Sequence, residues 1–218
     1  MNTNSPDAIA LFGGTFDPIH FGHIKPIVNV AQVLELDQVV LLPAHIPPHK
    51  AKAKVSPLHR KTMLSLVCQD YATFTIDDRE LRKDSPSYTV ETLLEYRQLH
   101  PKAKLYFCIG MDSLLSFTTW YQWQEILKLS NLIVTVRPGY DLADINPDTT
   151  ELLSQHQVSI DEVTKAKAGK IAIIASREYD ISSTEIRQLL IANKPINQLT
   201  TDKVCQYICE HQLYMQSE

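Results

Sequence analysis

Residues 11–23 read Leu11-Phe12-Gly13-Gly14-Thr15-Phe16-Asp17-Pro18-Ile19-His20-Phe21-Gly22-His23, and they join two regular elements. The apolar run in front of them, residues 8–12, is typical of a buried strand. Behind them, residues 24–36 carry apolar side chains three and four positions apart, which indicates an amphipathic helix. We therefore predict a strand-to-helix turn, with a helix that begins near Gly22 or His23.

This turn has the chemistry of an anion site. Gly13 and Gly14 lack a Cβ, so the backbone can approach an oxyanion closely. The new helix presents unpaired N–H groups and the positive end of its dipole. His20 and His23 are expected at this helix N-terminus, where their rings can donate hydrogen bonds to phosphate oxygens. Pro26 is expected in the first helical turn, where a missing N–H costs nothing.

The composition is that of an ordinary globular domain: 218 residues, 44% of them apolar, with a net charge of −4. The acidic balance disfavours a nucleic-acid partner, which would favour a basic face. No apolar run approaches the roughly 18 residues of a membrane span, and residues 1–7 lack a signal-peptide core. We expect one cytoplasmic domain over residues 1–218 with a C-terminal helical part at about 181–214, no membrane contact, and a monomer or weak homo-oligomer.

The cysteines contain no Cys-x-x-Cys pair, so a zinc site is not expected. Without a secretion signal, buried reduced thiols are predicted for Cys68, Cys108, Cys205 and Cys209.

Strands alternate with helices along the chain. Strands are predicted at residues 8–12, 38–43, 74–76, 104–110, 132–136 and 170–175. Helices are predicted at 24–36, 57–70, a segment ending near 100, 124–129, 148–156, 182–190 and 201–211. This order indicates an α/β fold with a doubly wound, Rossmann-like parallel sheet, helices on both faces and a site over the carboxyl ends of the strands. The charged segment 77–84 is expected to be mostly solvated. Leu58, Met63, Leu64 and Val67 are expected on a buried helix face.

Candidate ligand residues follow several of these strands. His49 and Lys50 come after a rigid Pro-Pro pair in a basic segment, which is either solvated or a positive flap over the site. Gly110 ends a strand, and Asp112 is placed to bond a ribose hydroxyl or merely to cap a helix. Arg137 carries a planar guanidinium that can bind the oxyanion of a phosphate in a bidentate manner; the alternative is a surface ion pair.

A second helix N-terminus suited to an anion begins at Ile181-Ser182-Ser183-Thr184-Glu185-Ile186-Arg187. Ser182 and Glu185 form a predicted capping box. Capping does not explain why hydroxyls follow at Ser183 and Thr184, or why Arg187 lies one turn further into the helix. We therefore predict that two helix N-termini, one early and one late in the chain, share one triphosphate.

Six motifs occur in order between residues 11 and about 214: GGTFDPxHxGH, PPHK, SYT, GxDSLxxFxxW, RPG and ISSTxIR. They are neither a Walker P-loop nor a GxGxxG fingerprint. Together they resemble the nucleotidyltransferases with the HxGH motif, and among these the bacterial nicotinate-mononucleotide adenylyltransferases. The resemblance implies transfer of the adenylyl group of ATP to nicotinate mononucleotide, giving deamido-NAD and pyrophosphate in NAD biosynthesis, with Mg²⁺ bound through the ATP phosphates.

The same resemblance completes the set of expected site residues. Catalytic roles fall on His20, His23 and Arg187. ATP is expected at Gly13, Gly14, Thr15, Phe16, Gly110, Asp112, Ile181, Ser182, Ser183 and Thr184. The acceptor is expected at His49, Lys50, Tyr88, Thr89, Trp120, Tyr121 and Arg137. Trp120 is implied as the platform for the nicotinate ring, whereas Trp123 is left to the core; from the residues alone, Tyr88 and Thr89 are equally a packing tyrosine and a capping threonine.

Three alternatives stay open. The acceptor is nicotinamide mononucleotide or phosphopantetheine; or a zinc hydrolase uses His20, His23, His45, His49 and Asp17; or the chain is a non-catalytic nucleotide sensor. The zinc hypothesis leaves both phosphate-type helix N-termini idle.

Overall fold

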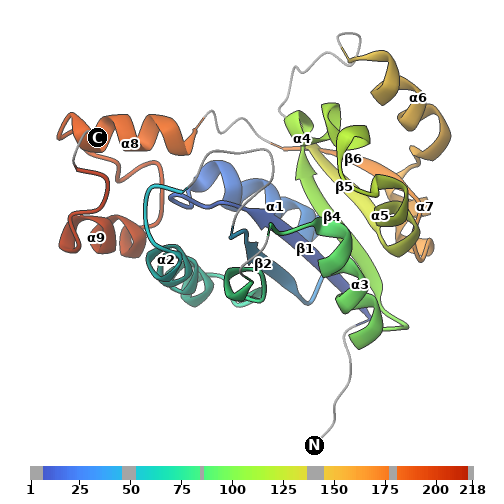
Figure 1. Ribbon diagram of the computed structural model, residues 1–218, viewed down its shortest axis with the longest axis horizontal. Coiled ribbons are helices and arrows are strands. Elements are labelled where there is room, and N and C mark those ends of the chain that lie inside the picture. Colours follow the sequence, from blue (N-terminus) through green and yellow to red (C-terminus); the bar gives the residue numbers. More distant parts are fainter. Residues whose placement is uncertain (1–6, 46–52, 84–85, 137–144, 177–180, 216–218) are drawn as a thin grey trace, which may run out of the picture.

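The structure is a computed structural model that describes residues 7–45, 53–83, 86–136, 145–176 and 181–215. Within these residues lies a six-stranded, all-parallel sheet with the order β3-β2-β1-β4-β5-β6 (Figure 1). Its strands are β1 (Ala8–Gly14), β2 (Val39–Pro43), β3 (Phe74–Ile76), β4 (Lys104–Gly110), β5 (Asn131–Val136) and β6 (Ile171–Ala175). The order reverses between β1 and β4, which confirms the predicted doubly wound sheet.

Helices cover both faces of this sheet. They are α1 (Phe21–Val33), α2 (Pro57–Asp70), η1 (Glu80–Arg82), α3 (Thr89–Leu99), α4 (Met111–Leu115), η2 (Phe117–Thr119), α5 (Trp123–Leu129), α6 (Pro147–His156), α7 (Ile160–Lys165), α8 (Ser183–Ile191) and α9 (Asp202–Glu210). In β1, Ala10 belongs to the buried cluster that contains residues of α1, α2, α8 and α9, whereas Ile9 and Leu11 belong to the cluster with residues of α3, α4, α5 and α6. This alternation follows from the two-residue period of a strand buried on both faces.

The two ends of the molecule have different helices (Figure 1). α2, α8 and α9 gather at one end, and α5, α6 and α7 at the other. Apolar residues of α8 and α9 belong to the same buried cluster as those of α1 and α2, and α9 packs against α2. In the described residues, no helix has both the length and the apolar character needed to cross a bilayer.

Several local expectations were wrong. Helix α1 begins at Phe21, so Pro26 lies inside the helix and not in its first turn; the His20 carbonyl already accepts from the His23 and Ile24 amides at 2.8 and 3.0 Å. Leu58 is 69% exposed, although Met63 and its apolar neighbours on α2 are buried as expected.

Of the cysteines, Cys108 is buried, Cys68 and Cys205 are partly exposed, and Cys209 is exposed. The expectation of a buried thiol was therefore wrong for Cys209. It lies next to the Val204–Ile208 stripe that α9 buries, on a part of the helix that faces solvent.

The segment 77–84 was expected to be mostly solvated, but its described residues, 77–83, contact α3. The Arg79 guanidinium donates to Asp77 at 2.6 Å and to Glu95 at 2.8 Å, and it stacks over the Tyr96 ring. Glu80 is buried. Arg79 and Lys83 pair with carboxylates of α3, whereas Asp78 pairs with Lys61 of α2, so this charged run is held by two helices.

Candidate active site

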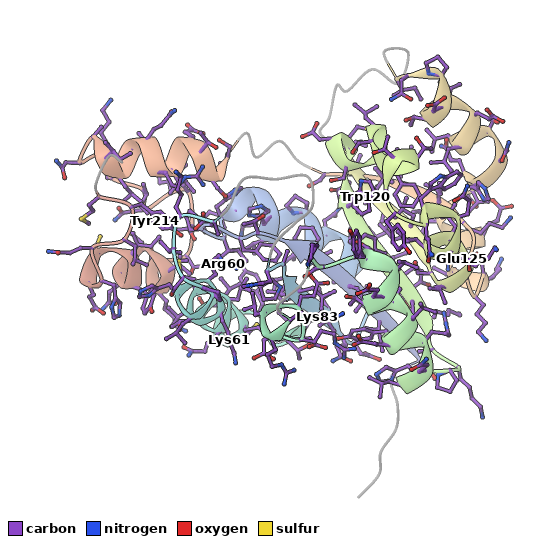
Figure 2. All side chains as sticks on the ribbon, in the orientation of Figure 1. Arg60, Lys61, Lys83, Trp120, Glu125 and Tyr214 are labelled. Carbon is purple, nitrogen blue, oxygen red and sulfur yellow. The ribbon has the colours of Figure 1, made fainter. Side chains whose placement is uncertain are left out.

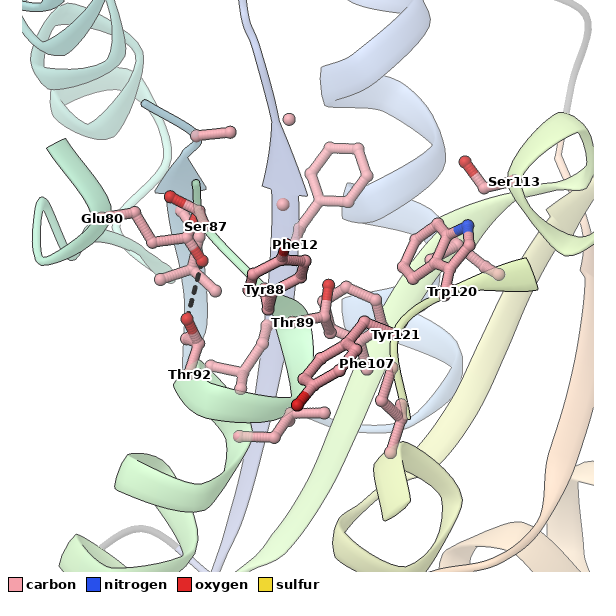
Figure 3. A pocket seen from close by; sticks show the side chains of 18 of the residues that line it. Phe12, Glu80, Ser87, Tyr88, Thr89, Thr92, Phe107, Ser113, Trp120 and Tyr121 are labelled. Carbon is pink, nitrogen blue, oxygen red and sulfur yellow. Dashed lines mark hydrogen bonds between the residues drawn. The ribbon is translucent and has the colours of Figure 1, made fainter. Parts of the chain in front are cut away.

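A cavity of about 580 Å³ opens at the carboxyl ends of β1 and β4, where the strand order reverses. Open α/β sheets bind their ligands at this place. Gly13, Gly14 and Thr15 from the end of β1 form one wall, and Gly110 with Asp112 after β4 forms another. Aromatic side chains close the far side, as Figure 3 shows.

The predicted site residues divide into three groups. Nine of them line the cavity: Gly13, Gly14, Thr15, Tyr88, Thr89, Gly110, Asp112, Trp120 and Tyr121. Eight lie outside its lining: Phe16, His20, His23, Ile181, Ser182, Ser183, Thr184 and Arg187. His49, Lys50 and Arg137 are outside the residues that the structure describes.

The aromatic end of the cavity is built from α3 and the η2–α5 connection. The Trp120 ring lies 5.6 Å from Phe117 and 6.2 Å from Phe107, edge-on to the latter. Tyr88 and Tyr121 meet at 4.8 Å, and Tyr121 is 54% exposed. These rings form an apolar wall beside the glycine-rich turn, suited to a flat heterocycle.

Two of the open capping alternatives are not what the structure shows. Gly110 is the N-cap of α4, and Asp112 is the second residue of that helix, on the cavity wall. Tyr88 is the N-cap of α3 without a side-chain bond, and Thr89 is its first helical residue. Asp112 and Thr89 therefore line the cavity without capping a helix.

The early helix N-terminus carries the two histidines. His20 is the N-cap of α1, and its ring stacks on that of His23 with centroids 3.8 Å apart. His23 in turn meets the Phe16 ring edge-on at 5.3 Å. His20 is 4% exposed, and its Nδ1 makes no hydrogen bond to the described part of the chain. Burial lowers the pKa of His20 from 6.5 to about 4, so the ring is neutral near pH 7.

This burial makes the free energy of unfolding depend on pH. Because the folded-state pKa of His20, about 4, is below the ordinary value of 6.5, the unfolded chain binds the extra proton between these values. We expect the contribution of His20 to be complete above pH 6.5 and to be lost as pH falls towards 4. Denaturant unfolding should show wild type losing stability more steeply than His20→Asn, by up to ~1.4 kcal/mol per pH unit. Parallel slopes would contradict a buried, neutral His20.

The late helix N-terminus lies directly beside the early one. Ser183 Oγ donates to the Pro18 carbonyl at 3.0 Å, and Arg187 Nη1 donates to the Asp17 carbonyl at 2.7 Å. A Cβ placed on Gly22 would lie 2.8 Å from the Ile181 carbonyl oxygen. The two helix N-termini that the sequence predicted to converge are therefore in contact. However, Ser183 and Arg187 donate hydrogen bonds to backbone carbonyls of the first turn.

The expected capping box at this helix is half present. Ser182 Oγ accepts from the Glu185 amide at 3.1 Å. The complete capping box in the described residues is at α7, where Ser159 and Glu162 bond each other's backbone amides. Arg187 also donates to Thr184 Oγ1 at 3.1 Å, so these two side chains orient each other.

Sequence reasoning missed several lining residues, among them Phe12, Glu80, Phe107 and Ser113. Glu80 Oε1 accepts from Thr92 Oγ1 at 2.7 Å, drawn as the dashed line in Figure 3. Burial raises the pKa of the Glu80 carboxyl. Its position soon after strand β3, at the edge of the sheet where ligands gather, was the available signal.

Known proteins are similar to this chain over nearly its whole length. The Cytidylyltransferase-like family model matches residues 11–189. A relative from Shewanella frigidimarina (strain NCIMB 400), named "Probable nicotinate-nucleotide adenylyltransferase", is 44% identical over 208 residues, which is 94% of this chain and 99% of the relative. A protein of the same name from Escherichia coli O157:H7 (strain EC4115 / EHEC) is 41% identical over 207 residues, covering 94% of this chain and 97% of its own.

Solved structures agree on the fold. The nicotinic acid mononucleotide adenylyltransferase of Plasmodium falciparum, complexed with NaAD, has a TM-score of 0.72 at 20% identity, over 95% of this chain and 97% of that one. The chain therefore belongs to the cytidylyltransferase-like family and, within it, to the bacterial nicotinate-nucleotide adenylyltransferases.

Proposed function

We propose that the cavity over β1 and β4 is where the adenylyl group of ATP passes to nicotinate mononucleotide, giving deamido-NAD and pyrophosphate. The observation that carries this assignment is the meeting, in one cavity, of the glycine-rich Gly13–Thr15 turn with an aromatic wall that contains Trp120. The first suits phosphate and the second suits a pyridine ring. The activity itself is that of the family to which the chain belongs.

The chemistry that these residues support is a direct displacement. An oxygen of the acceptor phosphate forms a bond to the α-phosphorus of ATP, the bond from that phosphorus to the bridging oxygen breaks, and pyrophosphate leaves. Catalysis then consists of alignment and of neutralising charge on the α-phosphate and the leaving group. We assign these tasks to residues that lie beside the cavity. Arg187 would neutralise charge, whereas the His20 and His23 rings, the amides of the turn and the hydroxyls at the start of α8 would donate hydrogen bonds to the triphosphate.

Mg²⁺ fits this site as a companion of the nucleotide. Among the described residues, no group of three or more His, Cys, Asp or Glu side chains is arranged to hold a metal ion. The carboxylates on the cavity wall are Glu80, already bonded to Thr92, and Asp112. We propose that ATP oxygens and water hold the ion, which would offset the negative charge of the triphosphate.

For the acceptor we propose that Trp120 stacks on the nicotinate ring and that Tyr88, Thr89 and Tyr121 border it. Arg137, His49 and Lys50 remain our proposed ligands of the mononucleotide phosphate. We further propose that residues 1–218 act as one domain in the cytoplasm, as a monomer or weak homo-oligomer.

Replacing Trp120 tests the acceptor end. Trp120→Leu keeps an apolar side chain against Phe107 and Phe117 but removes the stacking face. Since stacking on a base contributes ~1–3 kcal/mol, we expect KM for nicotinate mononucleotide to rise ~10-fold or more while KM for ATP stays unchanged. Trp123→Leu is the matched control, because Trp123 meets Phe117 at 6.0 Å and does not line the cavity. Equal effects of the two variants on acceptor KM would contradict the platform role.

The function is tested by steady-state pyrophosphate release from ATP with nicotinate or nicotinamide mononucleotide as acceptor. The proposal expects turnover with a clear preference for nicotinate. A preference for the amide would move the assignment to the alternative acceptor. Absence of release with either would favour a nucleotide sensor. Metal analysis of the purified protein addresses the zinc hypothesis, whose Asp17 carboxylate is bonded to the Tyr214 hydroxyl and to the Lys54 amide.

A further inference from the structure

Five hydrogen bonds join residues 183–214 to residues 17–21, which connect the glycine turn to α1. Arg187 donates to the Asp17 carbonyl (2.7 Å), Tyr214 to the Asp17 carboxylate (2.8 Å), Ser183 to the Pro18 carbonyl (3.0 Å) and Thr200 to the Ile19 carbonyl (2.9 Å). In the fifth, the Phe21 amide donates to the Leu199 carbonyl (2.8 Å). The adenylyl-transfer account uses only the Ser183 and Arg187 end of this set. Thr200 and Tyr214 are left without a task.

The Asp17 carboxylate is the buried centre of the set, with 5% of the residue exposed. Its Oδ1 accepts from the Tyr214 hydroxyl at 2.8 Å, and its Oδ2 accepts from the Lys54 amide at 2.6 Å. Both oxygens therefore have donors, as a buried carboxylate requires. Burial and the nearby Asp17 charge raise the pKa of Tyr214, which keeps its hydroxyl protonated and able to donate.

Arg60 approaches the same turn from α2, as Figure 2 shows together with Tyr214 on the side of the last helices. Arg60 is 1% exposed, and its Nη1 donates to the Thr15 carbonyl at 2.8 Å and to the Ala44 carbonyl at 2.7 Å. Burial lowers the pKa of Arg60, and the nearby charge of Asp17 opposes this shift. Arg60 thus joins the glycine turn to the residue that follows β2.

These bonds determine where the amides of the turn point. In a trans peptide the C=O and the following N–H point in opposite directions. Gly14 O accepts from the Ala44 amide at 2.9 Å, and Thr15 O accepts from Arg60, so the next N–H groups, of Thr15 and Phe16, point away from these partners. Hydrogen bonds to the Gly14 and Thr15 carbonyls therefore fix the two peptide planes whose N–H groups would donate to a phosphate.

We propose that Asp17, Arg60 and Tyr214 are positioning residues that set the nucleotide turn for ATP. This proposal rests on the function assigned above. Buried charged groups contribute little net stability compared with apolar residues of the same volume. The hydrogen bonds of Arg60 end on the Thr15 and Ala44 carbonyls, and those of the Asp17 carboxylate on the Tyr214 hydroxyl and the Lys54 amide, so their effect is on geometry. Tyr214 acts through Asp17 and touches no substrate.

The test compares two tyrosines of the C-terminal helical part that each lose one hydroxyl. Tyr214→Phe removes the donor to Asp17. Tyr207→Phe removes the hydroxyl that lies 2.9 Å from His59 Nδ1, away from the turn. Loss of a hydrogen bond to a charged group predicts that Tyr214→Phe raises KM for ATP ~10-fold, with acceptor KM and the Tyr207→Phe variant within about twofold of wild type. Equal ATP KM values for the two variants would overturn the proposal.

A double-mutant cycle with Asp17→Asn adds a readout that general destabilisation does not move. If Tyr214 acts through Asp17, Tyr214→Phe changes ATP KM little once Asp17 is Asn, whereas additive effects would contradict the network. Calorimetric affinity for ATP in wild type and Tyr214→Phe separates the two hypotheses. Absent turnover with a tenfold affinity difference would overturn the proposed function alone, and normal turnover with equal affinities would overturn the positioning role alone.

Discussion

The His23→Ala variant is expected to form deamido-NAD with kcat lowered ~10²-fold or more, as happens when a group that stabilises developing charge is removed. His23 is placed for that task at the N-terminus of α1, between the His20 ring at 3.8 Å and the Phe16 ring at 5.3 Å. Because both rings pack against His23, we expect its N–H donor to be oriented before ATP arrives. Pre-aimed donors cost no reorganisation during the reaction.

Two further variants decide whether the loss is chemical. His23→Asn keeps a side-chain N–H, so we expect a kcat between those of alanine and wild type. His211→Ala removes an exposed ring at the end of α9 and is expected to leave kcat unchanged. Single-turnover measurement of pyrophosphate release, with ATP saturating, isolates the chemical step. A His23→Ala kcat equal to wild type would remove His23 from the mechanism.

Gly22→Ala is expected to damage both stability and catalysis through steric overlap. The added Cβ would lie 2.8 Å from the Ile181 carbonyl oxygen and 2.9 Å from the His20 ring. The first contact is with backbone, which cannot rotate away. Overpacking of this kind costs ~1–3 kcal/mol, or roughly 2–4 °C in Tm for each kcal/mol in a chain of this size. Since displacement of about 1 Å in an active site can cost ~10²-fold, we expect kcat to fall ~10–10²-fold.

Thermal unfolding and steady-state kinetics on the same preparations measure both effects. Gly110→Ala is the control for stability, because a Cβ there meets nothing within 4 Å. A Gly22→Ala protein with wild-type Tm and kcat would show that the two helix N-termini do not need this close approach.

Short-range sequence patterns predicted most of the strands and helices, and about half of the predicted site residues line the cavity. The helix N-terminus at residues 181–187 was predictable because Ser182 and its neighbours form a short-range pattern. Glu80 was missed because its burial depends on Arg79 pairing with Asp77 and Glu95, which a single sequence shows only as a charged run. Whether a charge is paired or solvated is decided by the partner element and not by the charge itself.

Arg60 was missed for a different reason. It lies three, four and seven positions before Met63, Leu64 and Val67, so helical spacing puts it on the buried face of α2. An arginine at such a position breaks the apolar pattern, and Leu58 was assigned to that face in its place. The bond between Tyr214 and Asp17 had no local signal, because long-range polar pairs leave no periodic trace.

The contact between Asp17 and Tyr214 joins residues 197 positions apart. During synthesis, the turn around Asp17 leaves the ribosome almost two hundred residues before Tyr214, a delay of roughly 10–40 s at ~5–20 residues per second. During that interval the nascent chain contains the glycines and histidines of the turn but lacks the hydrogen bond from Tyr214. We therefore expect a translation product that stops before Tyr214 to use ATP poorly.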